Sequence, residues 1–160
     1  MKSLDKKAHA RDAAAFVESG EMVSTEKMLS KLKAVREIET FIEENGQGFY
    51  NSTIREHFDA LLEKYKISKA DAIERSGIER GYAYQILRGA KEAKRDKYIR
   101  LAIGMGLDLE DTQQLLTIAR HGILYSRILR DAVIIFGINN HFDIIKLQML
   151  LEEQHAEPLE

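Results

Sequence analysis

The 160-residue chain contains no cysteine, no tryptophan and a single proline, Pro158. Without cysteine it has no disulfide bond, no thiolate nucleophile and no cysteine-ligated zinc site, so its stability must come from packing. Because proline is the strongest helix breaker, its absence before residue 158 favours helices throughout the body of the chain. The one cluster of β-branched residues, Val-Ile-Ile at 133–135, is flanked on both sides by helix-compatible sequence. We therefore expect an all-α protein.

Long apolar runs are also absent, since none approaches the roughly 18 residues that cross a bilayer. Residues 1–16 include lysines, but no continuous apolar block follows them and Asp12 interrupts the stretch, which is unlike a signal peptide. With 44% apolar and 31% charged residues, the chain is too apolar to be disordered throughout. The composition predicts a folded cytoplasmic protein with no membrane partner.

Sequence signatures of catalysis and of metal binding are missing as well. The five histidines form no HExxH motif, and the chain has no GxxxxGK[ST] phosphate loop. The acidic residues Asp108 and Asp111 fit a helix cap and its third position better than an acid–base pair. We expect no enzymatic activity, no cofactor and no metal ion.

Hydrophobic periodicity and turn residues divide the chain into four parts. Residues 1–23 are polar and alanine-rich, and we expect them to be poorly ordered or weakly helical. Residues 24–50 predict one amphipathic helix, capped by Ser24 or Thr25 and ended by Gly46, with a turn after it. Residues 51–120 predict a DNA-binding domain of short helices, argued below, and residues 121–160 predict a C-terminal helical hairpin.

An ungapped duplication lies in the C-terminal half: residues 95–116 match residues 130–151 at a shift of 35. The identical pairs are Arg95/Arg130, Asp96/Asp131, Ile99/Ile134, Ile103/Ile138, Asp108/Asp143, Gln113/Gln148, Leu115/Leu150 and Leu116/Leu151. Each copy reads as a helix, a turn at residues 104–106 or 139–140, an aspartate cap and a second helix. We expect two helical hairpins whose apolar faces bury each other, with chance similarity between amphipathic segments as the alternative.

Residues 67–89 have the spacing of two short helices separated by a glycine turn, ISKADAIERSGIERGYAYQILRG. Ser68 is a good helix cap with Asp71 three residues on, Gly77 ends the first helix after about two turns, and Gly89 ends the second. This pattern resembles the lambda-repressor-like (Cro/C1, or XRE) helix-turn-helix family. The resemblance implies a five-helix DNA-binding domain, here flanked by an N-terminal amphipathic helix and a C-terminal helical hairpin repeat.

The resemblance also implies which residues contact DNA. By position in the motif, the base-contacting residues are Arg80, Gly81, Tyr84 and Gln85, and the backbone-contacting residues are Lys69 and Arg88. Arginine pairs with guanine, glutamine pairs with adenine, and lysine neutralises a phosphate. The basic loop after the second helix adds Lys91, Lys94 and Arg95 as expected contacts to the DNA backbone.

Charge is distributed unevenly along the chain, whose total is only −2. Residues 64–100 hold eleven cationic and five anionic side chains, a net charge of +6, whereas the remainder carries −8. DNA binding needs a local positive field, and this one coincides with the motif. A solvated charge run without a binding function is the alternative.

These features predict a sequence-specific transcriptional regulator, expected to be a repressor, that binds double-stranded DNA as a homodimer. The alternative is a protein-binding adaptor or antitoxin-like regulator, in which the helix-turn-helix is a scaffold and the C-terminal hairpins bind a protein partner. Two surfaces are candidates for dimerisation, namely the helix from Met28 to Ile42 and the apolar cluster of the second repeat. That cluster comprises Ile134, Ile135, Phe136, Ile138 and Phe142.

Overall fold

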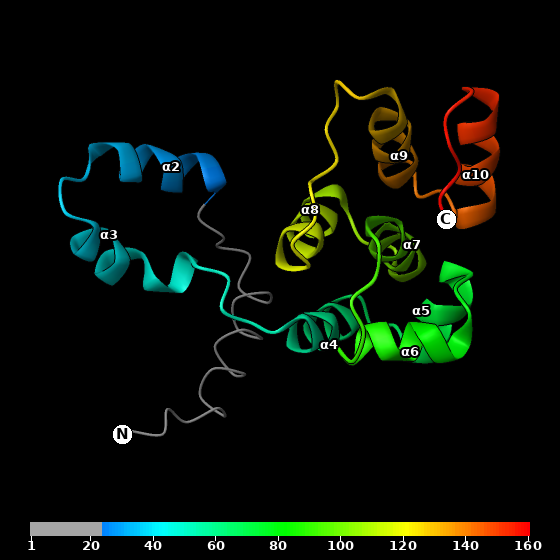
Figure 1. Ribbon diagram of the computed structural model, residues 1–160, viewed down its shortest axis with the longest axis horizontal. Helices are drawn as coiled ribbons and strands as arrows, with labels where there is room; N and C mark the ends of the chain where they lie inside the picture. Colours follow the sequence, from blue (N-terminus) through cyan, green and yellow to red (C-terminus); the bar gives the residue numbers. More distant parts are fainter. Residues whose placement is uncertain (1–23) are drawn as a thin grey trace. The chain divides into compact units, whose positions relative to one another are not determined.

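The computed structural model describes residues 24–160, which form nine α-helices, one short 3-10 helix and no strand (Figure 1). The predicted all-α class is thus confirmed for this part of the chain. The expectation of a weakly ordered N-terminus falls on residues 1–23, outside the described residues. The chain divides into two compact units, one ending at Ser52 and the other spanning Thr53–Glu160. The second unit holds both the segment resembling a DNA-binding domain and the C-terminal hairpin.

The first unit contains α2 (Thr25–Ala34), α3 (Ile38–Asn45) and the 3-10 helix η1 (Gly46–Gly48). The sequence predicted a single helix here, and that prediction was wrong. The chain leaves the helical conformation at Val35, where ψ is 148°, and re-enters a helix only after Glu37. Apolar residues recur every three or four positions on both sides of this break, so periodicity alone does not reveal it.

Side chains hold α2 and α3 together around a small apolar contact. The Lys31 ammonium donates to the Asn45 side-chain oxygen at 3.1 Å, and the Asn45 amide donates to the Phe41 carbonyl at 2.9 Å. The buried Phe41 ring meets Phe49 edge to face, with ring centroids 6.0 Å apart. Most apolar residues of these helices are nevertheless exposed, as expected for a unit this small.

The second unit begins with α4 (Ile54–Lys64), α5 (Lys69–Ser76) and α6 (Arg80–Leu87). A capping box of Thr53 and Glu56 starts α4, and the Ser68 hydroxyl accepts the Asp71 N–H at 3.1 Å to start α5, as predicted.

Four further helices complete the second unit: α7 (Arg95–Met105), α8 (Leu109–Ile118), α9 (Leu129–Asn139) and α10 (Ile144–Glu153). They form two consecutive hairpins at the positions predicted from the duplication. Helices α7 and α9 are equivalent, as are α8 and α10, and each second helix is capped by its aspartate. Helix α7 contacts α10 while α8 contacts α9, so the hairpins pack reciprocally.

Two bidentate ion pairs cross between the hairpins. Arg95 donates to both carboxylate oxygens of Asp131 at 3.0 and 2.9 Å, and Arg130 donates to both oxygens of Asp96 at 3.1 and 2.7 Å. Each repeat therefore supplies an arginine to the aspartate of the other. This exchange relates the two hairpins by an approximate two-fold symmetry.

The structural repeat is longer than the sequence match, because an extended return segment follows each hairpin. Arg95 also donates to the carbonyls of residues 122 and 123, and Arg130 donates to those of residues 157 and 158. The Gln113 side-chain amide donates a hydrogen bond to the Leu124 carbonyl and accepts one from the Leu124 N–H. Gln148 makes the same two hydrogen bonds with Leu159. Each pair of equivalent residues differs by 35, so the repeat extends to the end of the described chain.

One glycine has a role that differs from its predicted one. Gly104 was expected in a turn with Gly106, yet it lies in the last turn of α7, and only Gly106 adopts the left-handed conformation, with φ of 71°. A Cβ on Gly104 would lie 2.5 Å from the Ala72 carbonyl oxygen and 2.8 Å from the Ser76 nitrogen. The absence of a side chain therefore lets α5 approach α7 closely.

Candidate nucleic-acid interface

Helices α5 and α6 are joined by a three-residue turn whose geometry follows from the local sequence. Gly77 ends α5 in the left-handed conformation, with φ of 66°. The Glu79 carboxylate starts α6 by accepting the N–H groups of Gly81 and Tyr82 at 2.8 and 2.7 Å. These two backbone hydrogen bonds lower the pKa of Glu79. The cap aligns the first turn of α6, where the expected base-contacting residues begin.

Helix α6 buries one face and exposes the other. Ala83, Ile86 and Leu87 are fully buried in the core of the second unit. The opposite face carries the residues expected to contact bases, with Arg80 and Gly81 exposed and Tyr84 and Gln85 half-buried. Tyr82 and Tyr84 are both half-buried against the core, and Tyr84 is the one expected to contact bases.

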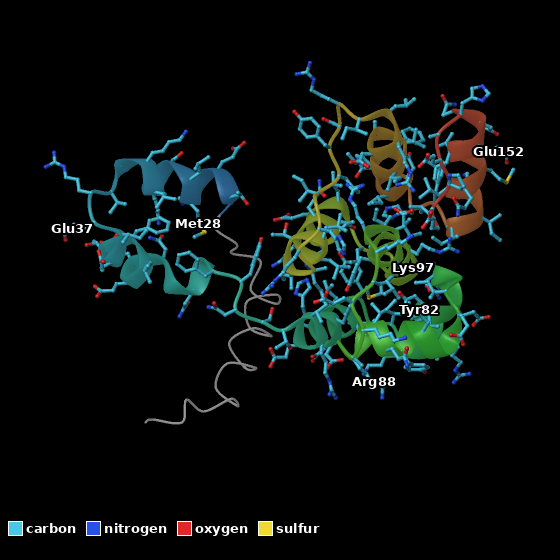
Figure 2. The ribbon with its side chains drawn as sticks, viewed as in Figure 1. Met28, Glu37, Tyr82, Arg88, Lys97 and Glu152 are labelled. Atoms are coloured by element: carbon cyan, nitrogen blue, oxygen red, sulfur yellow. The ribbon has the colours of Figure 1, made fainter. Side chains whose placement is uncertain are left out.

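Arg80, Tyr84 and Arg88 follow one another at intervals of four residues, so they lie along one line of the helix surface. The Arg80 guanidinium lies over the Tyr84 ring, 5.7 Å from its centroid, which restricts the arginine side chain. Arg88 caps the end of the helix and extends from the edge of the unit (Figure 2). A short row of donors thus follows the exposed side of α6.

The residues expected to contact the DNA backbone differ in their availability. Within residues 24–160, the exposed Arg88 and Lys91 form no ion pair. Lys69 lies 3.4 Å from Asp59, and Lys94 lies 3.0 Å from Glu160, whose hydrogen bond and charge raise the pKa of Lys94. Such exposed pairs are weak, so a phosphate can replace the carboxylate at both positions.

Arg95 occupies a different position from the one expected of a DNA contact. Its guanidinium is bound to two carbonyls of the return segment and to Asp131, and its side chain is only 26% exposed. Moving it to a phosphate would leave the Asp131 carboxylate, which is 4% exposed, without its cation. The structure therefore uses Arg95 to join the hairpins. The sequence signal for this role is that an arginine, Arg130, occupies the equivalent position in the second repeat.

Arg100 is a residue that sequence reasoning missed. It donates to the Ser76 carbonyl at 3.0 Å and to the Leu159 carbonyl at 3.0 Å, and it lies 3.5 Å from the Gly77 carbonyl. It therefore links the turn between α5 and α6 to the return segment of the second hairpin. No local pattern marks it, since its equivalent in the second repeat is Ile135.

A partly buried polar cluster ties the end of α4 to α8. The Asp111 carboxylate accepts hydrogen bonds from the Lys64 ammonium at 2.8 Å and from the Tyr65 hydroxyl at 2.5 Å. The nearby His57 is buried, its Nε2 atom has no hydrogen-bond partner among residues 24–160, and burial lowers its pKa to about 4. Asp111 thus anchors a helix contact, in addition to occupying the predicted position in the first turn of α8.

Among residues 24–160 no group of three or more histidine, aspartate or glutamate side chains is placed to hold a metal ion. In the same part of the chain, no helix has the length and apolar character needed to cross a membrane. Comparison with protein-family models, with curated proteins and with solved structures finds no match to this chain. The resemblance to the lambda-repressor-like family is therefore carried by the motif residues alone.

Proposed function

We propose that the protein is a sequence-specific DNA-binding transcriptional regulator, most simply a repressor, with α6 as its major-groove recognition helix. The observation that carries the proposal is the exposed face of α6 and the loop after it. Arg80, Arg88 and Lys91 are exposed there and have no ion-pair partner within the described residues. Cations without a carboxylate partner can bind DNA without first breaking an intramolecular ion pair.

The residue types on this face suit base recognition. An arginine can donate two hydrogen bonds to guanine, and Gln85 can pair with adenine in the same bidentate way. Gly81 presents no side chain beside Arg80, which allows the backbone of α6 to approach the base edges closely. Two copies of the protein, related by a two-fold axis, would read two half-sites about 34 Å apart.

The proposal is tested by selecting bound sequences from random duplexes and then measuring affinity by fluorescence anisotropy over a range of salt concentrations. Arg80→Ala and Gln85→Ala are expected to relax the preference at one or two positions, at about 1–3 kcal/mol each. Lys91→Ala should weaken binding to all duplexes alike and reduce the salt slope by about one. Arg127→Ala is the matched control, because Arg127 is an exposed cation in the connection between α8 and α9.

Failure of the wild-type protein to enrich any sequence at low salt would contradict the proposal. The remaining candidate would then be the protein-binding adaptor. The exposed apolar side chains of the second hairpin, described next, are the observation that favours a protein partner.

A further inference from the structure

Helix α10 presents an exposed apolar face. Ile145 and Met149, one helical turn apart, are 73% and 57% exposed, whereas Ile144, Leu147 and Leu151 of the same helix are buried. The helix lies at the edge of the second unit (Figure 1). Two large apolar side chains this exposed on one helix face mark a surface that another molecule can cover.

The duplication allows this face to be compared with the equivalent face of α8 in the first repeat. The residues equivalent to Ile145 and Met149 in α8 are Glu110 and Gln114, which are polar. The equivalent of Lys146 is Asp111, and its carboxylate is covered by the end of α4 through Lys64. Helix α8 is thus polar on the face that the end of α4 contacts. The equivalent face of α10 is apolar, and its Ile145 and Met149 side chains are exposed.

Charges at the two ends of α10 indicate what covers the face. Lys146 lies in the first turn, with its ammonium 4.1 Å from the centroid of the Phe142 ring, and Glu152 and Glu153 lie in the last turn. All three charged side chains belong to exposed residues, and none forms an ion pair within residues 24–160. Lys146 therefore places a cation at one end of the face, beside the Asp143 cap, and the other end carries two anions.

A face with this polarity is complementary to itself in the antiparallel orientation. If α10 packs against α10 of a second copy about a two-fold axis near Met149, each Lys146 faces Glu153 of the other copy. The Ile145 and Met149 side chains then pack along the seam between two helices that lie about 8–10 Å apart. A parallel pair would instead place like charges side by side.

We propose that the exposed face of α10 is a self-association surface, on which a second copy of this chain docks by an antiparallel α10–α10 contact. The inference deepens the homodimer of the proposed function but is independent of the DNA contacts on α6. Helix α10 has only 10 residues, so the contact is small and the dimer forms in a concentration-dependent manner. Of the two candidate surfaces predicted from the sequence, this one belongs to the second repeat, but it lies on the second helix of that hairpin.

Sedimentation velocity of the full chain at concentrations up to about 200 µM tests the self-association. The wild-type protein should approach a dimer, and Ile145→Asp should raise the dissociation constant by about a hundredfold or more, since two copies lose the apolar contact. Leu32→Asp is the matched control, because Leu32 is an exposed leucine on α2. Its dissociation constant should equal that of the wild type.

Charge reversal tests the orientation of the two helices. The Lys146→Glu protein and the Glu153→Lys protein should each be monomeric when studied alone, because like charges would then face each other across the two-fold axis of the dimer. An equimolar mixture of the two variants should recover a dimer that contains one copy of each. Circular dichroism should show unchanged helix content for all variants, since every substituted side chain is exposed.

Three results would overturn the inference: a wild-type protein that stays monomeric, a dimer that resists Ile145→Asp, or charge variants that fail to recover on mixing. The outcome is separable from that of the proposed function. Arg80→Ala should lower DNA affinity without changing the sedimentation mass, whereas Ile145→Asp should lower the mass and leave binding to a single half-site.

Discussion

Protonation of His57 is expected to destabilise the protein as the pH falls from 6.5 toward 4. The side chain is 2% exposed in α4, and its Nε2 atom has no hydrogen-bond partner within the described residues. Burial lowers the pKa of His57 to about 4, against an ordinary value of 6.5. The negative charge of Asp111 opposes this effect, and the positive charge of Lys64 adds to it.

The sign of the effect follows from proton linkage. Between pH 6.5 and about 4, the unfolded chain binds a proton at His57 that the native protein does not bind. Stability is therefore fully present above pH 6.5 and is lost as the pH falls toward 4. A pKa difference of about 2.5 corresponds to a maximum loss of about 3 kcal/mol in the free energy of unfolding. About 2.5 kcal/mol of this should be lost by pH 4.5.

The aspartates that cross between the hairpins act in a lower pH range. Burial is the largest single influence and opposes their ionisation. The arginine hydrogen bonds, the backbone N–H groups of Glu160 and Tyr125 and the arginine charges together outweigh it and lower both pKa values. Their stabilisation is present above the ordinary carboxyl pKa and is lost below it. The range from pH 6.5 to 4.5 thus reports mainly on the histidine.

Urea unfolding followed by far-ultraviolet circular dichroism at pH 7.5 and 4.5 measures the effect. His57→Phe, which keeps a planar ring and removes the titrating group, should make the free energy of unfolding much less dependent on pH over this range. His155→Asn is the matched control, because His155 is exposed and asparagine tolerates its positive φ of 55°. A His57→Phe protein that lost as much stability as the wild type would refute the reasoning.

Two further substitutions test the packing of the second unit by urea unfolding. Gly104→Ala should destabilise it by about 2 kcal/mol, because the added Cβ would meet backbone atoms of α5, which no side-chain rotation relieves. Gly122→Ala, where a Cβ has no neighbour within 4 Å, should be close to neutral, and equal effects would exclude the close approach as the cause. Asp131→Asn should lower stability by about 2 kcal/mol by leaving Arg95 without its anion, whereas Glu160→Gln, which removes an exposed pair, should have little effect. If Glu160→Gln lost as much stability as Asp131→Asn, the burial of Asp131 would not be the reason why its ion pair stabilises the protein.

Features that depend on neighbours in the chain could be predicted from the sequence. The Ser68 cap, the left-handed Gly77 and the paired aspartate caps of α8 and α10 are set by hydrogen bonds and φ values within a few residues. The duplication was also visible, because the equivalent Arg–Asp and Gln pairs are retained at a constant shift. The break at Val35 was not visible, since the apolar period continues through it.

The partners of the charged side chains were decided by the tertiary structure. Arg88 and Arg95 look alike in a basic stretch of sequence, yet Arg88 is exposed and Arg95 is bound to an aspartate 36 residues away. Arg100 and Gly104 likewise acquire their roles only where α7 meets α5 and the return segment. The sequence by itself determined most of the helices, their caps and the repeat, because these arise from local hydrogen bonding and periodic hydrophobicity. Which cations are free to meet a partner, and which apolar face is left uncovered, depended on contacts between residues far apart in the chain, and only the folded structure decides these.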